Sequence, residues 1–519
     1  MENLTPFARK VLAASGASEE LQEEILHPHD LFPVSRAKSM QAFRARLQQA
    51  KENNEKVLIA GDYDCDGILS TAIFTKGLDN YGVINSYHIP NRLKEGYGLN
   101  PKTVEQAYAQ GYSLIITCDN GVHADAALQK ARELGVEVIV TDHHLIDGDV
   151  DCSVLVHPDT LEPEFAYLCG AGIAYECIRA LQADNAELLV YAAIASVADC
   201  MEVGRQTRCI IQKGLDLFNR NPDPHFAPFV RSFPITERDA GFQIAPRINA
   251  IGRLADRATA KYFVNYLKNR DPQKIANYAA KVDALNEERK QLSSQVYGKC
   301  ELLINPLRPV LLAKDPAFHE GVIGLAAGNL CTHYHKPAIV CTEAAEGFKG
   351  SMRAPKGFHC LEFLNEFDGF ATLGGHAQAA GFTVKKERWQ DFEAFIRDHG
   401  REYTWSEEVK LPIDIEPWEV TVANIRSLDA LRPFGTGFEM PQFRISEPVL
   451  TGYFDMSQGR HRKFSLEGGL QAINFNQSSV DANAAMDQIE SFKGTLSISS
   501  YRGRESADFL IDEITYKEA

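Results

Sequence analysis

The sequence predicts an α/β fold in three parts: a domain built on a parallel sheet, a second α/β domain joined to it by a long helix, and a small C-terminal β-barrel. Short β-branched runs alternate with helical stretches over the first half of the chain, which is typical of a parallel sheet covered on both faces. A long charged helical stretch follows. From about residue 410, short alternating runs and turn residues replace the helix signals, which indicates a barrel or sandwich.

The first domain contains short apolar runs, which predict strands, separated by helical stretches. The predicted strands are 57–60, 83–89, 114–118, 136–141 and 154–156. The predicted helices are 69–81, 103–110, 124–134, 166–182, 186–198 and 258–268. The segment 219–234 holds four prolines and is predicted to be a loop.

The second half begins with a predicted helix over 272–298, whose many charged residues suit a solvated connection between domains. A second α/β block runs from about 309 to 400. The predicted strands beyond it are 443–451, 464–466, 470–474, 494–499 and 507–514.

The composition is that of a folded protein without a membrane anchor. Of 519 residues, 45% are hydrophobic, which excludes wholesale disorder, and the length suits two to four domains. No apolar stretch approaches the ~20 residues that span a bilayer, and the N-terminus lacks the pattern of a signal peptide. The 11 cysteines are scattered without a C-x-x-C pair, as expected for free thiols in the cytoplasm. The net charge of −16 argues against a surface that binds polyanions everywhere, yet it allows a local basic channel.

Carboxylates and imidazoles follow three of the predicted strands. They are Asp62, Asp64 and Asp66 after the first strand, Asp119 after the third, and Asp142, His143 and His144 after the fourth. The carboxyl ends of parallel strands are where open α/β sheets bind ligands. So much negative charge in one place is costly unless a cation neutralises it.

Ligand sets of Asp and His without a thiolate suit Mn²⁺ or Mg²⁺ rather than structural zinc. Two such ions, about 3.5–4 Å apart, need a bridging carboxylate; together they activate a water and stabilise the leaving oxygen in phosphoester cleavage. The residues therefore predict a metal-dependent phosphoesterase, and they leave its substrate open.

The order of these motifs resembles the DHH phosphoesterase superfamily, in which Ala198-Asp199 matches a further motif. More closely, the chain resembles the RecJ family of bacterial single-strand-specific 5′→3′ exonucleases. Additional matching segments are 91–99, 246–254, 319–324, 350–353, 374–377, 431–435 and 472–475. The resemblance spans about residues 55–515. It departs from the family at 434–441, where Phe438-Glu-Met440 stands in place of the usual Gly-Asn-Pro stretch.

The resemblance implies a role for each residue of the site. The implied metal ligands are Asp64, Asp66, Asp119, His143 and Asp199, with Asp119 as the bridge between two ions. Asp62, Asp142 and His144 match catalytic positions beside the metals, and His144 is expected to contact a metal or the scissile phosphate. The implied phosphate-binding residues are Arg92, Arg253, Ser351, Arg353, His319 and His376. Guanidinium groups suit this role because they bind phosphate through two hydrogen bonds, and capture of a terminal 5′-phosphate would set the polarity.

The resemblance also implies a domain division. It comprises a lead-in (1–55), a DHH domain (56–268), a connecting helix (269–300), a DHH-associated domain (301–402) and an OB-fold-like domain (403–519). The last would guide the strand by stacking and charge. Its candidates are Phe434, Tyr453, Phe454 and Phe464, with Arg460, Arg462 and Lys463, although core packing and a solvated hairpin tip explain these residues as well.

The leading interpretation is an exonuclease that hydrolyses single-stranded DNA to 5′-mononucleotides with two Mn²⁺ or Mg²⁺ ions, in DNA repair or recombination. One alternative is a DHH enzyme acting on short oligonucleotides or cyclic dinucleotides, although such relatives usually lack a C-terminal OB-fold. Another is a non-catalytic nucleic-acid-binding relative, which the intact ligand set argues against. We expect a monomer in the cytoplasm, with no membrane contact and with a single-strand-binding protein or a helicase as protein partner.

Overall fold

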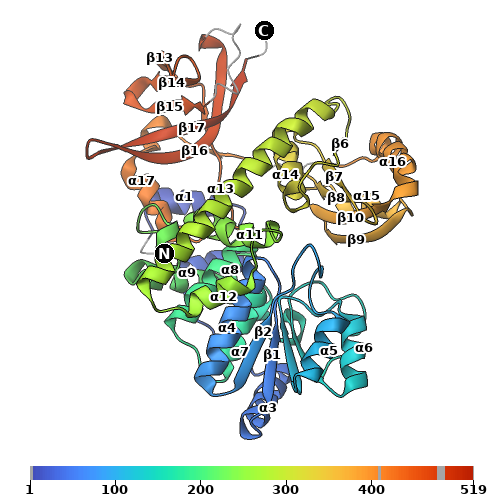
Figure 1. Ribbon diagram of the computed structural model, residues 1–519. Helices are drawn as coiled ribbons and strands as arrows, with labels where there is room; N and C mark the ends of the chain where they lie inside the picture. The colour runs from blue at the N-terminus through green and yellow to red at the C-terminus, as the bar shows by residue number, and fades with distance from the viewer. Residues whose placement is uncertain (1–3, 407–410, 476–485, 518–519) are drawn as a thin grey trace.

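The computed structural model describes residues 4–406, 411–475 and 486–517, and these form three sheets in three domains (Figure 1). The sheet of the first domain is parallel throughout, as predicted. Its strands, in spatial order, are β2 (Ile84–His88), β1 (Lys56–Ala60), β3 (Leu114–Cys118), β4 (Glu137–Thr141) and β5 (Val154–Val156).

Helices pack on both faces of this sheet. They include α3 (Lys38–Glu52), α4 (Cys65–Tyr81), α5 (Pro101–Ala109), α6 (Asp125–Leu134), α7 (Gly170–Ala180), α8 (Ala186–Ala198), α9 (Arg205–Arg220), α11 (Ala245–Arg253) and α12 (Lys261–Lys268). The helix predicted at 69–81 begins earlier, because the side chain of Asp64 caps it by accepting a hydrogen bond from the Gly67 N–H. The first turn of α4 therefore carries Asp66.

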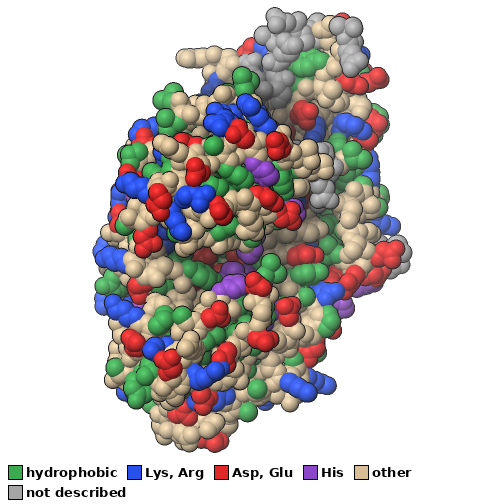
Figure 2. All heavy atoms as spheres, turned by 90° about the vertical axis from the view of Figure 1, so that its right-hand side faces the viewer, with side chains coloured by type: hydrophobic (Ala, Val, Ile, Leu, Met, Phe, Trp, Pro, Cys, Tyr) green, Lys and Arg blue, Asp and Glu red, His purple; other side chains and the backbone are tan. Residues whose placement is uncertain are grey.

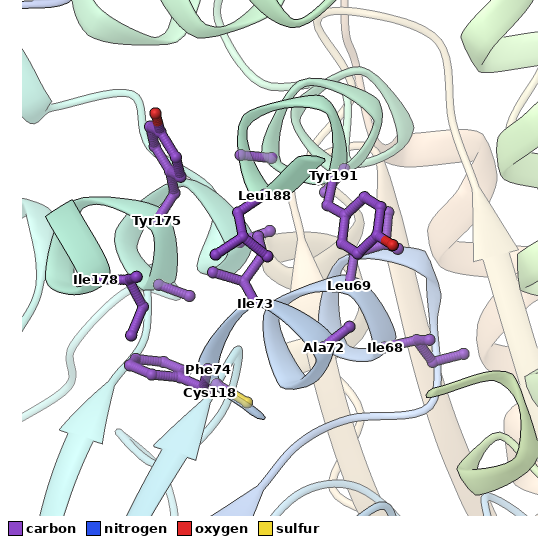
Figure 3. Packing of buried hydrophobic residues seen from close by; sticks show 14 of the residues in the cluster. Ile68, Leu69, Ala72, Ile73, Phe74, Cys118, Tyr175, Ile178, Leu188 and Tyr191 are labelled. Atoms are coloured by element: carbon purple, nitrogen blue, oxygen red, sulfur yellow. The ribbon is translucent and has the colours of Figure 1, made fainter. Parts of the chain in front are cut away.

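Helix α4 is the centre of the core (Figure 3). Leu69, Ile73 and Phe74 are fully buried between the sheet and the helices α7 and α8. Gly77 lies so close to α7 that an added Cβ would meet the Ile178 side chain at 2.5 Å. Packing along the whole helix fixes the position of α4, and with it that of the acidic loop that precedes it.

The N-terminal lead-in connects the two ends of the chain. Helices α1 (Pro6–Ala14) and α2 (Glu19–Leu26) place their apolar faces in the core of the C-terminal domain, whereas α3 packs against the first domain. The sequence analysis predicted none of these three helices, nor α9 and α11. The C-terminal domain is thus packed against the first domain through α1 and α2 as well as through its own residues.

The long helix α13 (Pro272–Leu303) leads to the second domain (Figure 1). That domain has a mixed sheet with β6 parallel to β7 and its other pairs antiparallel. Its strands, in spatial order, are β6 (Leu311–Lys314), β7 (Ala338–Ala344), β8 (Gly347–Arg353), β10 (Ala379–Lys385) and β9 (Phe370–His376). Its helices include α14 (Ile323–Tyr334), α15 (Cys360–Asn365) and α16 (Trp389–Glu402).

The C-terminal domain is a β-domain, as predicted, with α17 (Val422–Ser427) beside it. Its strands, in spatial order, are β11 (Ile413–Asp414), β12 (Phe443–Ser446), β16 (Ile489–Tyr501), β17 (Arg504–Tyr516), β15 (Gln471–Asn474), β14 (His461–Leu466) and β13 (Leu450–Met456). The strand predicted at 443–451 is two strands, because the backbone turns at Glu447, with φ +46°, before Pro448. Parts of the predicted domain, 407–410, 476–485 and 518–519, lie outside the described residues, and the exact domain boundaries stay a prediction.

The candidate aromatic side chains of this domain divide into two kinds. Phe434 and Phe464 are buried in the core, whereas Tyr453 and Phe454 on β13 are 51% and 68% exposed. Arg462 forms an ion pair with Asp455 across the β13–β14 hairpin.

Among the helices of the described chain, none combines the length and apolar character needed to cross a membrane.

Candidate active site

The predicted metal ligands meet at the carboxyl ends of three neighbouring strands. The Asp62–Asp64–Asp66 loop follows β1, Asp119 follows β3, and His143 follows β4; Asp199 caps the C-terminus of α8. The Nε2 atom of His143 lies 3.1 Å from Asp119 Oδ1. It lies 3.5 Å from Asp199 Oδ2 and 3.7 Å from Asp66 Oδ2. The structure thus brings all five implied ligands, and Asp62, into one cluster.

The donor atoms form overlapping groups, each with its ligand atoms within 4.8 Å of one another. The groups are Asp62, Asp64 and Asp119; Asp66, His143 and Asp199; and Asp119, His143 and His144. Because Asp119 belongs to two groups, its carboxylate lies where one residue can serve two ions. Carboxylate oxygens and imidazole nitrogens without thiolates are the donors that suit Mn²⁺ and Mg²⁺.

The electrostatics of the cluster also fit divalent cations. Burial, reinforced by neighbouring carboxylates, raises the pKa of Asp62, Asp64, Asp119 and Asp199. The Oδ1 atom of Asp62 is buried and accepts no hydrogen bond from residues 4–406, 411–475 or 486–517. A cation at these donors would neutralise the buried negative charges and give Asp62 Oδ1 a partner, so the residues present fit a metal pair.

Asp66 is oriented by the N-terminus of α7. Its two oxygens accept hydrogen bonds from the backbone N–H groups of Gly170, at 2.7 Å, and Ala171, at 2.8 Å. A Cβ at Gly170 would meet the Asp119 side chain at 2.6 Å, so only glycine fits there. The sequence analysis missed Gly170. The signal available was the small-residue run Cys169-Gly-Ala-Gly172 after a loop.

The backbone around Asp119 is also fixed by specific contacts. Asp119 has φ +63°, a left-handed conformation that is uncommon for a residue with a side chain. The Tyr97 hydroxyl donates a 2.7 Å hydrogen bond to its carbonyl oxygen. The side-chain amide of Asn120 donates to the Ala60 carbonyl at the end of β1. The Asn120 bond joins the ends of β1 and β3 behind the cluster, and the Tyr97 bond holds the Asp119 backbone in its left-handed conformation.

Asp142 serves as an acceptor of hydrogen bonds. Its Oδ1 accepts from the backbone N–H of His143 at 2.8 Å and from the Nδ1 of His144 at 2.7 Å, and its Oδ2 accepts from the Val122 N–H at 3.0 Å. Burial opposes ionisation, but these bonds hold the pKa of Asp142 below its usual value. Burial likewise opposes the charge on His144, but Asp142 raises its pKa. Asp142 therefore orients His144 and leaves its Nε2 for another partner.

The predicted phosphate-binding residues form a second, cationic cluster. The Arg92 guanidinium, between β2 and α5, lies over the Tyr63 ring at 5.2 Å. Arg353, on β8, donates to Ser351 Oγ at 2.9 Å. Burial, reinforced by the like charges of Arg92 and Arg353, lowers the pKa of Arg253 to about 9. Partly buried guanidinium groups that repel one another favour an anion such as phosphate between them.

The cationic cluster draws on both domains, since Arg92 and Arg253 come from the first domain and Ser351 and Arg353 from β8 of the second. The rings of His144, in the first domain, and His376, at the end of β9, stack at 6.2 Å. Figure 2 shows histidine side chains gathered in the hollow between the two lobes. His319 accepts a hydrogen bond from the Gly321 N–H and pairs with Asp256 at 3.3 Å, so it links the domains. Its contact with phosphate stays a prediction, as do the catalytic roles of the other residues.

Arg289, on α13, was missed by the sequence analysis. Its Nη2 donates to Asn286 Oδ1 at 2.7 Å, while its Nε is buried without a hydrogen-bond partner in the described parts of the chain. The charge of Arg289 also lowers the pKa of Arg253, after burial, Arg92 and Arg353. One charged residue in a long charged helix gives no signal in sequence, because only the packing distinguishes it from its solvated neighbours.

Comparison with known families places these features in order along the chain. The model of the DHH family, N-terminal domain, matches residues 56–204, that of the DHHA1 domain matches 308–399, and that of the RecJ OB domain matches 413–513.

Curated relatives align with nearly the whole chain. The single-stranded-DNA-specific exonuclease RecJ of Bacillus subtilis (strain 168) is 29% identical over 546 residues, which cover 99% of this chain and 69% of that protein. The enzyme of the same name from Escherichia coli (strain K12) is 29% identical over 575 residues, covering 98% of this chain and 96% of that protein.

Solved structures are similar as well. The crystal structure of RecJ in complex with Mn²⁺ from Thermus thermophilus matches 99% of this chain and 79% of that chain with a TM-score of 0.84; at 24% identity this likeness shows the fold. A crystal structure of exonuclease RecJ bound to manganese matches 73% of this chain and 97% of that chain, with 27% identity and a TM-score of 0.63. With the DHH, DHHA1 and RecJ OB domains in this order, the chain belongs to the RecJ family of the DHH phosphoesterases.

Proposed function

We propose that the protein is a metal-dependent exonuclease that degrades single-stranded DNA from the 5′ end to 5′-mononucleotides, in DNA repair or recombination. The observation that carries the proposal is the pair of neighbouring clusters, one acidic and one cationic. A set of buried and half-buried carboxylates with His143 lies at the strand ends of the first domain, and an arginine–serine cluster from both domains lies beside it. Relatives named as single-stranded-DNA-specific exonucleases cover nearly the whole chain.

Asp64, Asp66, Asp119, His143 and Asp199 would hold two Mn²⁺ or Mg²⁺ ions. Bound there, the ions would activate a water for attack on phosphorus and stabilise the leaving oxygen. Crystal structures of RecJ with Mn²⁺ and with Mg²⁺ support this choice of metal.

The residues of the chain itself position the substrate. Arg92, Arg253, Ser351 and Arg353 would bind the terminal 5′-phosphate, with charge-assisted hydrogen bonds from the guanidinium groups. This contact would fix the distance from the strand end to the cleavage position, so that one nucleotide is removed at a time. Asp142 orients His144, whose Nε2 would then contact a metal or the scissile phosphate, and His376 would contact the same phosphate from the second domain.

The C-terminal domain supports a polymeric substrate. Tyr453 and Phe454 are exposed on β13, and exposed aromatic side chains on such a sheet stack with bases at about 1–3 kcal/mol each. An enzyme for short oligonucleotides or cyclic dinucleotides would have no use for this surface.

We also propose that the protein acts as a monomer in the cytoplasm. One chain supplies both clusters, and all 11 cysteines are free thiols, which suits a reducing compartment. Because single strands are produced by helicases and coated by single-strand-binding proteins, we propose one of these as the protein partner. Sedimentation analysis tests the monomer, and co-purification from cell extract tests the partner.

The function is tested with internally labelled single strands blocked at the 5′ or the 3′ end, incubated with Mn²⁺. We expect stepwise loss of nucleotides only from strands with a free 5′ end. Cleavage restricted to dinucleotides would favour the short-substrate alternative, and binding without metal-dependent cleavage would favour a non-catalytic relative.

A further inference from the structure

The segment 431–440, here called the junction loop, contacts all three domains. Its second half departs from the family pattern at Phe438-Glu-Met440, and the proposed function leaves the loop unused. The loop belongs to the C-terminal domain, and Phe434 and Phe438 are buried in the core of that domain. Its backbone reaches the first domain, and Glu439 pairs with Lys356 of the second domain at 2.5 Å.

Arg208 on α9 anchors the start of the loop. The residue is 2% exposed, and its guanidinium donates to three backbone carbonyls of the loop. The acceptors are the carbonyls of Leu431 at 2.9 Å, Arg432 at 2.8 Å and Pro433 at 3.1 Å. Within the described parts of the chain the side-chain hydrogen bonds of this buried cation go to one loop, which fixes that loop against the first domain, because releasing it would leave the charge unpaired.

Thr436 then pairs with the segment that follows α8. Its carbonyl oxygen accepts a 2.9 Å hydrogen bond from the Val203 N–H, and its hydroxyl donates to the Cys200 carbonyl at 2.6 Å. The glycines on either side of Thr436 allow the loop to lie close to this segment. A Cβ at Gly435 would lie 2.6 Å from Val203 Cγ2, and one at Gly437 would lie 2.7 Å from Glu202 Cγ.

Cys200 directly follows Asp199, the proposed ligand that is held least firmly by its own contacts. Two backbone N–H groups hold the carboxylate of Asp66, whereas that of Asp199 is 30% exposed and, among the described residues, forms an ion pair with His143 alone. The position of Asp199 therefore depends on its backbone. That backbone leaves α8 through Cys200, at φ +54°, and is held there by Thr436.

We propose that Thr436 is a positioning residue for the metal centre. By its hydrogen bond to the Cys200 carbonyl it holds Asp199 in place. Docking of the C-terminal domain thereby sets the affinity for the metal ion that Asp199 binds. The proposal rests on the proposed function, because it takes the metal pair as given. It makes the junction loop the contact through which the strand-binding domain and the metal centre act on each other.

The test is Mn²⁺ binding measured by titration calorimetry on the full chain. Thr436→Val removes the hydroxyl and keeps the size of the side chain and the backbone bond to Val203. We expect one of two Mn²⁺ ions to bind about three- to tenfold more weakly, the effect of losing one hydrogen bond that orients a ligand, and the other to be unchanged. Thr436→Ser restores the hydroxyl and should restore the affinity. Gly435→Ala, which pushes the loop from Val203, should weaken the same ion.

The matched control is Thr451→Val in the same domain, which also removes a hydroxyl that donates to a carbonyl, that of Ser465, at 3.1 Å. It should bind both ions as the unchanged protein does. Equal Mn²⁺ affinities for Thr436→Val, Gly435→Ala and the unchanged protein would overturn the proposal. If the unchanged protein itself bound no Mn²⁺, the proposed function would fail first, and the two failures are thereby distinguished.

Discussion

Replacing Asp119 with asparagine separates two consequences of a buried acidic cluster, which are the lower stability of the metal-free protein and the catalytic activity of the metal-bound protein. Without metal, the carboxylate of Asp119 is destabilising, because burial and the charges of Asp66 and Asp64 raise its pKa. Asp119→Asn keeps the shape and removes the charge. We therefore expect the metal-free variant to melt at a higher temperature than the metal-free parent, while its hydrolysis of DNA is lost.

The sizes of both effects follow from the geometry. Asp119 lies in two of the donor groups, so its loss affects both ions, and we expect activity to fall at least about a thousandfold, or roughly 4 kcal/mol of barrier. For the parent, Mn²⁺ at 100 times its Kd adds about 2.7 kcal/mol of stability. In a domain of this size that corresponds to a rise of about 5–10 °C in Tm. The variant should show no comparable rise.

The assay is thermal unfolding with EDTA and with Mn²⁺, run beside the nuclease assay. Asp216→Asn, an exposed charge change on α9, serves as the control and should behave as the parent does in all measurements. A metal-free Asp119→Asn protein that melts below the parent, or one that keeps the full Mn²⁺ shift, would refute the reasoning about the buried charge.

Three further predictions concern other parts of the molecule. Arg353→Ala should raise KM for 5′-phosphorylated strands about 10- to 100-fold, because it removes charge-assisted hydrogen bonds to the phosphate, and should change KM little for 5′-hydroxyl strands. Equal effects on both kinds of strand would contradict this role; Arg397→Ala, at an exposed arginine, is the control. His376→Ala should lower kcat about 10- to 100-fold without changing Mn²⁺ affinity, because within the described parts of the chain its ring meets the site at the His144 ring. Weaker Mn²⁺ binding in calorimetry would argue that His376 is a metal ligand instead. Phe74→Ala should cost about 3–5 kcal/mol in the free energy of unfolding, measured with denaturant, because the ring is fully buried; a loss below about 1 kcal/mol would contradict the packing in Figure 3.

The parallel sheet and its acidic edge could be predicted because both depend on local patterns. Apolar runs mark β1, β3 and β4, and the carboxyl ends of parallel strands meet at one edge, so Asp62, Asp119 and His143 were expected together. The start of α4 was predicted four residues late, since its cap is the side chain of Asp64, a residue that also reads as a metal ligand.

Contacts between distant segments could not be read from such patterns. The sequence of an amphipathic helix such as α1 shows which face is apolar. It does not show that this face packs in the core of the domain at the other end of the chain. The arginine–serine cluster was expected from the family resemblance alone, because Arg92 and Arg353 lie on separate domains. Gly170 has no side chain that would mark it in the sequence. It contributes a backbone N–H that binds Asp66, and the absence of a Cβ leaves room for the Asp119 side chain.

Above all, we expect the acidic cluster to hold two ions and the arginine cluster to bind the strand end beside them. Anomalous diffraction from crystals grown with Mn²⁺ and a non-hydrolysable 5′-phosphorylated oligonucleotide tests it most directly. We predict two peaks about 3.5–4 Å apart that share Asp119, with the 5′-phosphate at Arg253 and Arg353. A single peak away from Asp119, or a strand whose 3′ end occupies the arginine cluster, would contradict the account.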